Sequence, residues 1–303
     1  MKSFAEVIQF NKSQNQCFIQ ELKADLAGGQ FSRITDSLAK TLEERLEYPP
    51  ARARSVIDMF RGLHELPREL WPDVLYSIMM ELINHTYGAD VPFFDVKDFP
   101  WVAEVESRFV GIRNELEKVV DRIELVPAFQ EVQKDQYRIT ADDKWKVVVF
   151  QGFGKKFQDN LDAFPVTTEA LNCIPEWSTG MFSILKPGKK IPPHTGRYKG
   201  VLRYHLGLVV PSGCAISVKS EVRSWVEGGS LIFDDTFVHS AWNESPRVRA
   251  VLFVDFLRPL PFPMNLINEW MVFDIIKNTS FIKDTEANVE KFQPLLNDLK
   301  AKA

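Results

Sequence analysis

Cysteine is scarce in this sequence, long apolar runs are missing, and neither sign of charge dominates. The three cysteines, Cys17, Cys173 and Cys214, are widely spaced and include no CxxC pair, which argues against a disulfide framework and against a zinc ribbon. No stretch approaches the roughly 18 consecutive apolar residues of a membrane-spanning helix. The polar residues within 1–16 do not fit a signal peptide. We therefore expect a cytoplasmic protein without a transmembrane segment.

The charge balance excludes one class of partner. The chain has 37 basic and 41 acidic side chains and a net charge of -4, so it offers no broad attraction for polyphosphate. We expect no nucleic acid partner. What the sequence does contain is apolar material: 45% of its 303 residues are hydrophobic. That content is sufficient for one large domain or two ordinary ones.

Residues 1–88 predict a helical N-terminal region. Apolar side chains at Ile34, Leu38 and Leu42 recur every four positions, which places them on one face of a helix. The Pro49-Pro50 pair predicts a break between two helices, because proline has no backbone N–H and disfavours helix in the residue before it.

The central part of the chain, 89–262, has a different pattern. An apolar stripe over 101–123 predicts one initial helix. After Pro127, short runs rich in Val, Ile, Phe and Trp alternate with turn residues. The predicted strands cover 145–151, 180–185, 202–210, 215–218, 229–233 and 249–256. Many short strands separated by turns indicate a β sandwich or barrel. Helical spacing returns over 263–303, which predicts a C-terminal helical segment.

Histidine carries the first chemical signal. Three of the five histidines, His194, His205 and His239, lie in the β-rich part. His194 follows a turn-rich approach, and His239 follows an apolar strand. Two histidines on different strands of a jelly roll can converge on a metal, since neutral imidazole suits Fe(II) and Zn(II). The alternative is that each is an ordinary hydrogen-bonded histidine of the surface or core.

Ordered motifs around these histidines indicate a family. They are Ser183-Ile184-Leu185-Lys186-Pro187-Gly188, Pro193-His194-Thr195-Gly196, Leu202-Arg203-Tyr204-His205-Leu206-Gly207-Leu208, Trp225-Val226-Glu227-Gly228, Phe233-Asp234-Asp235, His239-Ser240-Ala241-Trp242 and the strand from Arg249 to Asp255. With these motifs, the segment from Trp145 to Pro259 resembles the aspartyl/asparaginyl β-hydroxylase family of Fe(II)- and 2-oxoglutarate-dependent oxygenases, which includes bacterial lipid A hydroxylases. The resemblance implies a mainly β catalytic domain over 89–262, a double-stranded β-helix, which is the jelly roll of cupin-like proteins.

The resemblance implies that His194 and His239 are the catalytic Fe(II) ligands, with 2-oxoglutarate and O2 as co-substrates. Most such oxygenases complete a facial triad with a carboxylate, but the position two after His194 is Gly196. The family is known for this absence, so water or the co-substrate would complete the metal's shell. Three alternatives stay open: a 2-oxoglutarate-dependent halogenase with a halide opposite Gly196, a Zn(II) enzyme, and a non-catalytic jelly-roll protein that binds a metal or a small acid.

A basic pair supports an acidic co-substrate. Arg203 and His205 alternate with apolar residues, so on a strand both point to the same side. The resemblance implies that they bind the 2-oxoglutarate carboxylates together with Ser183 and Arg249. Arg249 is preferred over Arg247 because it stands six residues before Asp255, as in the family. There are three alternatives. Ser183 could only form hydrogen bonds within its own strand, Arg247 could take the place of Arg249, and His205 could be a buried residue with a structural role.

Substrate choice depends on a departure from the animal members. The position two before Arg203, where the peptidyl-aspartate hydroxylases have an arginine for the substrate carboxylate, is Val201. We therefore expect a small-molecule, acyl-lipid or amino-acid substrate, including an amino acid tethered to a carrier protein, with peripheral membrane contact for a lipid. Trp145, Arg197 and Lys199 are candidate substrate residues, with surface roles as the alternative.

Other residues of the motifs receive structural roles. The sequence favours core or rim positions for Trp225 and Trp242, rather than catalytic ones. Asp234 and Asp235 are expected to fix the loop before His239 or to support the site without touching the metal.

Overall fold

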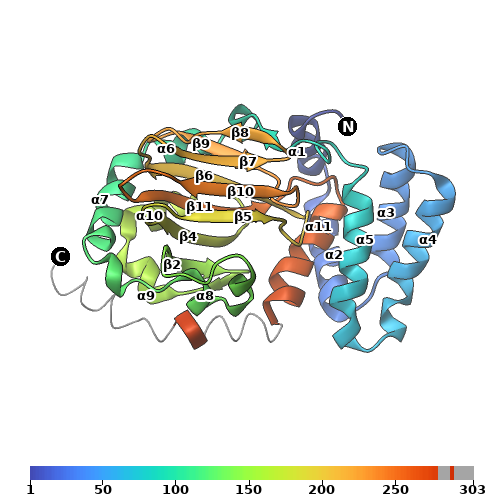
Figure 1. Cartoon of the computed structure of the whole chain (residues 1–303). Coiled ribbons are helices and arrows are strands. Elements are labelled where there is room, and N and C mark those ends of the chain that lie inside the picture. The colour runs from blue at the N-terminus through green and yellow to red at the C-terminus, as the bar shows by residue number, and fades with distance from the viewer. Residues whose placement is uncertain (279–286, 290–303) are drawn as a thin grey trace. The chain divides into compact units, whose positions relative to one another are not determined.

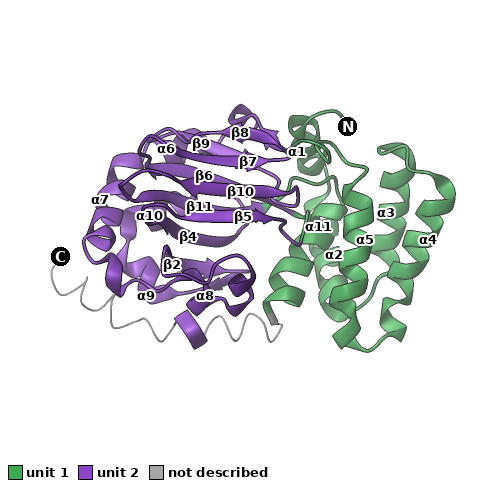
Figure 2. Cartoon of the chain, viewed as in Figure 1, with its two compact units in different colours: residues 1–91, 198–200, 257–278 green, residues 92–197, 201–256, 279–303 purple. Residues whose placement is uncertain are grey.

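The chain is divided into two compact units (Figure 2). The computed structural model describes residues 1–278 and 287–289, so much of the predicted helical segment 263–303 lies outside the described residues. Unit 1 comprises residues 1–91, 198–200 and 257–278, and unit 2 is built around 92–197 and 201–256. Each unit therefore draws on parts of the chain that are distant in sequence.

Unit 1 is helical. Its helices are α1 (Phe4–Lys12), α2 (Gln16–Gly28), α3 (Ser32–Glu44), α4 (Pro50–Arg61), α5 (Trp71–Ile83) and α11 (Met264–Trp270), with 3-10 turns at Gly62–Glu65, Arg68–Leu70 and Ile276–Asn278 and a π-helical turn at Met271–Ile275 (Figure 1). Helix α4 begins at Pro50, where the missing N–H costs nothing because the first turn has no intrahelical acceptor. One apolar core joins residues of α2 to α5 with Leu260, Phe262 and Trp270. The segment 257–278 thus belongs to the helical unit.

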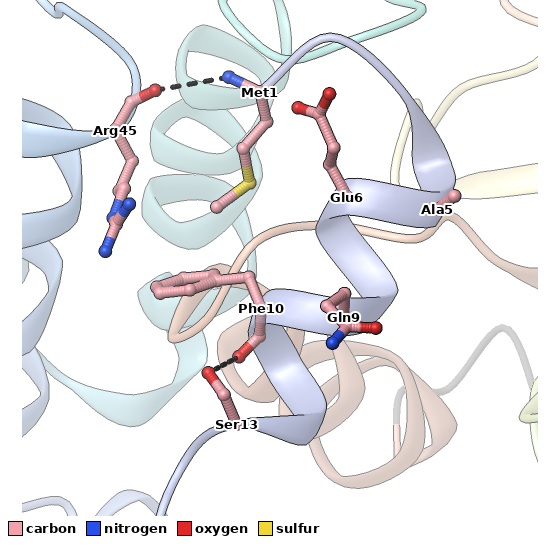
Figure 3. Close-up of a pocket in the computed structure, with 7 residues that line it drawn as sticks. All are labelled: Met1, Ala5, Glu6, Gln9, Phe10, Ser13 and Arg45. Atoms are coloured by element: carbon pink, nitrogen blue, oxygen red, sulfur yellow. Dashed lines mark hydrogen bonds between the residues drawn. The ribbon is translucent and has the colours of Figure 1, made fainter.

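Unit 1 also holds a shallow depression of about 540 Å³ (Figure 3). It is lined by Met1, Ala5, Glu6, Gln9, Phe10, Ser13 and Arg45. The Arg45 guanidinium lies 5.0 Å from the centre of the Phe10 ring, and the Ser13 hydroxyl donates to the Phe10 carbonyl. None of the site residues predicted from the sequence lines it.

Among the described residues, no helix combines the length and the apolar character needed to cross a bilayer.

Unit 2 contains the predicted jelly roll, and its two sheets confirm the expected fold class. The strands are β1 (Phe93–Phe94), β2 (Trp145–Gly152), β3 (Lys155–Lys156), β4 (Trp177–Leu185), β5 (Lys190–His194), β6 (Val201–Val209), β7 (Cys214–Val218), β8 (Glu221–Arg223), β9 (Ser230–Phe233), β10 (His239–Asn243) and β11 (Arg249–Leu257). The larger sheet has the order β1-β9-β6-β11-β4-β2-β3 and the smaller one β5-β10-β7-β8. Alternate residues of these strands form one core, which includes Val147, Met181, Val218 and Phe253.

Unit 2 also contains short helices. They are α6 (Val102–Glu106), α7 (Phe109–Val120), α8 (Phe129–Val132), α9 (Gln158–Ala163) and α10 (Pro165–Asn172), with 3-10 turns at Val96–Asp98, Ile123–Leu125 and Lys134–Arg138. The span predicted as one helix over 101–123 is thus divided. At the division, the Ser107 hydroxyl donates to the Glu104 carbonyl and competes with the helical ladder. The buried Glu115 carboxylate accepts the backbone N–H groups of Val166 and Thr167, which fixes the start of α10 on α7.

One strand, β5, lies where the sequence favoured a turn. Strand β5 contains Pro192 and Pro193, which the sheet tolerates because β5 is an edge strand and needs no donor on its free side. It pairs antiparallel with β10, and His194 is aligned with His239. The turn-like proline motif is therefore the strand that presents the first histidine.

Candidate active site

The two predicted metal ligands are neighbours. His194 is the last residue of β5 and His239 the first of β10, and the strand register places them opposite one another. Their ring centroids are 4.0 Å apart. His239 is buried, while His194 is half-buried. The sequence-based expectation that these residues converge is therefore met by the geometry of one strand pair.

Both rings direct Nδ1 to a backbone carbonyl, which favours Nε2 as the metal-binding nitrogen. Nδ1 of His194 lies 2.9 Å from the Pro192 carbonyl oxygen, and Nδ1 of His239 lies 3.0 Å from that of Phe237. A carbonyl only accepts, so each Nδ1 carries the hydrogen and each Nε2 keeps its lone pair. Burial, followed by the charges of His194 and Arg203, lowers the pKa of His239 to about 3. Burial also lowers the pKa of His194. Neutral imidazoles oriented by their Nδ1 hydrogen bonds fit a divalent transition metal.

The space beside Gly196 is filled by a carboxylate. The Gly196 N–H donates to the backbone carbonyl of Asp235 at 2.7 Å, and a Cβ at position 196 would overlap the Asp235 carboxylate. Residues 1–278 and 287–289 contain no cluster of three or more His, Cys, Asp or Glu side chains arranged for a metal. The described site thus offers a histidine pair, with Asp235 occupying the volume that a side chain on residue 196 would need.

Arg203 holds that carboxylate. Its Nη2 lies 2.9 Å from Asp235 Oδ2, and its Nε and Nη2 donate to the two carboxylate oxygens of Asp255 at 2.8 and 3.0 Å. Its guanidinium also lies 4.2 Å from the centre of the Phe253 ring. Burial opposes the charge on Arg203, but the carboxylates of Asp235 and Asp255 raise its pKa. The predicted contact of Arg203 with the co-substrate stays a prediction; its described partners are these two carboxylates.

We expect Asp255→Ala to lower the free energy of unfolding by about 1–3 kcal/mol, because it leaves the buried Arg203 Nε without its acceptor while Asp235 still balances the charge. Denaturant titration of the purified variant measures the effect. Asp135→Ala is the matched control: it removes an ion pair with Arg197 whose side chains are 31% and 68% exposed, for which we expect a loss below about 1 kcal/mol. Equal losses in the two variants would contradict a structural role for the Arg203 ion pairs.

Arg249 differs from Arg203 in having no counter-ion. It is only 2% exposed, and no carboxylate in the described part of the chain lies within ion-pair distance of it. Its Nε has no hydrogen-bond partner, and burial lowers its pKa to about 10. Arg247 is exposed and precedes β11, so the structure favours Arg249 as the interior cation. A buried guanidinium without a carboxylate is suited to bind an anion.

The other predicted co-substrate residues share this interior. Both ring nitrogens of His205 are buried without a partner, and burial, with the charges of Arg249 and Arg203, lowers its pKa well below the usual range. The Trp145 indole N–H donates to the Ser183 hydroxyl oxygen at 3.0 Å. The Ser183 hydroxyl hydrogen therefore remains available for another acceptor. Trp145, which the sequence analysis placed at the substrate entrance, is buried, and its contact in this interior is the hydrogen bond to Ser183.

Sequence reasoning assigned Trp225 to the core or rim and missed its chemical surroundings. Trp225 is buried, and its indole N–H has no acceptor. The Arg249 guanidinium lies 4.2 Å from the centre of the Trp225 ring, and the His205 ring stacks on it at 5.9 Å. The Trp225-Val226-Glu227-Gly228 motif was the available signal, but spacing alone could not show that its indole meets Arg249.

The remaining candidate substrate residues are spread out. Arg197 is exposed and its Nη2 lies 2.8 Å from Asp135 Oδ2. Lys199 belongs to unit 1, where its backbone N–H faces Met80 Sδ at 3.5 Å. Val201 is the first residue of β6 and is half-buried. Their roles toward a substrate stay predictions.

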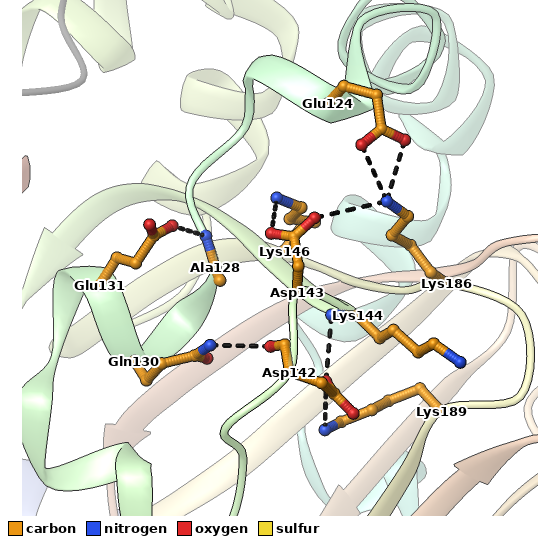
Figure 4. Close-up of polar contacts among 10 residues, drawn as sticks. All are labelled: Glu124, Ala128, Gln130, Glu131, Asp142, Asp143, Lys144, Lys146, Lys186 and Lys189. Atoms are coloured by element: carbon orange, nitrogen blue, oxygen red, sulfur yellow. Dashed lines mark hydrogen bonds and ion pairs between the residues drawn. The ribbon is translucent and has the colours of Figure 1, made fainter.

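A lysine network anchors the start of the strand that bears His194 (Figure 4). The buried Lys189 Nζ donates to Asp142 Oδ1 at 2.8 Å, as Figure 4 shows. It also donates to Thr140 Oγ1 at 2.7 Å. Lys186 pairs with Glu124, and Lys146 with Asp143. The Lys189 carbonyl also accepts the Asn243 N–H at the far end of β10. The network fixes β5 and β10 at the ends opposite their histidines.

A double-stranded β-helix with a paired, neutral histidine site is the architecture of a cupin-fold oxygenase. A model of the Aspartyl/Asparaginyl beta-hydroxylase family matches residues 106–259. The chain is 44% identical over 218 residues to an ornithine lipid ester-linked acyl 2-hydroxylase from Rhizobium tropici, a match that covers 70% of this chain and 77% of that protein. The chain belongs to the aspartyl/asparaginyl β-hydroxylase family, and its relatives are hydroxylases.

Two further similarities cover less of the chain or are weaker. Human aspartyl/asparaginyl beta-hydroxylase is 36% identical over 122 residues, which is 38% of this chain and 16% of the human protein. A solved prolyl-4-hydroxylase from Pseudomonas putida has a TM-score of 0.33 and 15% identity, covering 50% of this chain and 87% of that structure.

Proposed function

We propose that this protein is an Fe(II)- and 2-oxoglutarate-dependent dioxygenase that hydroxylates an unactivated C–H bond in the acyl chain of a lipid. One observation carries the proposal: in the described part of the chain, the buried Arg249 has no counter-ion, and two adjacent histidines each direct Nδ1 to a backbone carbonyl. A metal and an organic anion are the ligands that this combination of groups requires.

The residues present fit these ligands. His194 and His239 would hold Fe(II), which when bound supplies the centre at which O2 and 2-oxoglutarate react, with release of succinate and CO2. Arg249 provides the positive charge for a co-substrate carboxylate, and His205 and Ser183 provide polar contacts in the same interior. Arg203 would act on the co-substrate while it stays paired with Asp235 and Asp255. The apolar side chains around them exclude bulk water from the reacting groups.

Asp235 argues against the halogenase alternative. In a halogenase, a halide would occupy the metal position that is open because the usual triad carboxylate is missing. Here the carboxylate of Asp235 lies against Gly196, and a second anion beside it would be repelled. We therefore favour hydroxylation.

Two observations support an acyl-lipid substrate. The relative from Rhizobium tropici, which matches most of this chain, is named an acyl 2-hydroxylase of a lipid. Val201 brings no charge to the position from which an arginine would meet an acidic substrate. A lipid substrate implies peripheral contact of a cytoplasmic protein with the membrane. Free small molecules and amino acids, including carrier-tethered ones, are the alternative substrates.

The expected assay result is succinate release that depends on an acyl-lipid substrate and is weak with aspartyl peptides. An unpaired buried carboxylate is costly, so peptides with an acidic target residue should bind poorly to a site that lacks the arginine. The assay compares hydroxyacyl lipids, aspartyl peptides and free amino acids with the unmodified protein and with Val201→Arg. The substitution should reduce lipid turnover and improve peptide binding. Robust hydroxylation of the peptides by the unmodified protein would overturn the substrate proposal.

A further inference from the structure

The charge on Arg249 needs an explanation before any ligand binds. The side chain is 2% exposed, and its Nε lacks a hydrogen-bond partner. A buried guanidinium keeps its charge and is therefore expected to pair with an anion or another electron-rich group. In the described part of the chain its close neighbour of suitable chemistry is an aromatic face, that of Trp225, at 4.2 Å from the guanidinium carbon to the ring centre.

An indole face is a good partner for a guanidinium that must stay charged and still accept an anion. The ring quadrupole attracts the cation without using its N–H donors, so these remain directed at an incoming carboxylate. A carboxylate side chain in the same place would instead occupy these donors, as Asp235 and Asp255 occupy donors of Arg203.

The chain fixes Trp225 by contacts that do not depend on a ligand. Residue 225 lies in the loop between β8 and β9, where Gly207 of β6 pairs with Glu227. A side chain at Gly207 would overlap the Val226 carbonyl oxygen, so glycine is what permits this close approach. The Glu227 carboxylate is held by Arg113 Nη1 at 2.5 Å and by the Val210 N–H at 3.0 Å. The loop therefore presents the indole at a set position.

We propose that Trp225 is a positioning residue for the co-substrate: its indole face keeps the Arg249 guanidinium oriented to receive the carboxylate of the keto acid that lies away from the metal. The inference rests on the proposed function, because it assumes a dicarboxylate keto acid. Ring contacts run from the His239 ring through those of Phe233 and His205 to Trp225, so Arg249 and the histidine pair lie at opposite ends of this series of contacts. Trp225 would thus set the preference for an acid with a second carboxylate.

The test compares two keto acids of equal chain length on the Fe(II)-loaded full chain without oxygen, by calorimetry. 2-Oxoglutarate has the second carboxylate and 2-oxopentanoate lacks it. We expect the unmodified protein to prefer 2-oxoglutarate strongly, and Trp225→Leu to reduce that preference by roughly 10-fold while the affinity for 2-oxopentanoate stays unchanged. Trp225→Phe keeps an aromatic face and should lose only about two- to threefold in preference.

The outcomes separate the two proposals. A structural defect in Trp225→Leu would weaken the binding of both acids equally, and this would overturn the positioning role. An unchanged preference in Trp225→Leu would also overturn it, as would an equal loss of preference in the Phe and Leu variants. If the unmodified protein binds both acids equally, the proposed co-substrate and the positioning role both fail. Trp242→Leu is the matched control. Trp242 is half-buried on β10, aligned with Ala215 and Lys190, and should leave the preference as it is.

Discussion

Replacing either His194 or His239 by alanine is expected to abolish Fe(II) binding and, with it, all turnover. The site offers two imidazoles whose rings are 4.0 Å apart, and no cluster of three or more His, Cys, Asp or Glu side chains suited to a metal exists in the described residues. With one imidazole gone, the part of the chain that the structure describes has no ready-made ligand cluster to take its place. Loss of a supporting hydrogen bond alone costs about 10- to 100-fold in metal affinity, so loss of a ligand should exceed that range.

Anaerobic calorimetry with Fe(II) measures the effect without any need for substrate. His64→Ala is the matched control, because His64 also directs Nδ1 to a backbone carbonyl, that of Arg61, but is exposed in unit 1. We expect its Fe(II) affinity to equal that of the unmodified protein. Retention of full affinity by either His194→Ala or His239→Ala would show that the ligand assignment is wrong.

Gly196→Asp restores the usual triad in sequence, yet we expect it to destabilise the protein and to give no gain in hydroxylation. The new Cβ would overlap the Asp235 carboxylate, which Arg203 holds in place. Overpacking of this kind costs about 1–3 kcal/mol, and the added charge lies beside one of the same sign. The Asp235 carboxylate would have to leave Arg203 to admit the new one.

Denaturant titration and the succinate assay together check this expectation. Gly152→Asp provides a matched control, since a Cβ at position 152 meets nothing within 4 Å and the residue lies in the same unit. It should unfold at nearly the same denaturant concentration as the unmodified protein. A rise in hydroxylation rate for Gly196→Asp, with stability unchanged, would show that the glycine is not integral to the site.

Much of the β architecture could be predicted from the sequence because short apolar runs bounded by turn residues leave a local signature. The predicted runs 145–151, 180–185, 215–218 and 249–256 each lie within or almost within one of the observed strands β2, β4, β7 and β11. Strand β5 could not be found in this way, because its two prolines read as a turn unless the strand is known to lie at a sheet edge.

Pairings across the barrel were equally hidden. Arg203 and Asp255 are separated by 52 residues, and nothing in local pattern indicates that two carboxylates share this arginine. The same applies to Trp225 and Arg249, whose contact depends on the close approach of the loop at Gly207. Residue types indicate which side chains could bind a metal or an anion. Only the three-dimensional structure shows that the charge of Arg203 is balanced by carboxylates while that of Arg249 is not.

The composition of unit 1 has a consequence for how the protein is made. The helical core combines residues of α2 to α5 with Leu260, Phe262, Met264 and Trp270, which follow the whole jelly roll in the chain. During synthesis the N-terminal helices emerge first, yet Phe31 and Trp71 meet the Trp270 ring only after residue 270 has been added. All strands of the β unit are thus synthesised before the helical unit can close, and a fragment cut after residue 91 leaves apolar surface on the N-terminal helices uncovered.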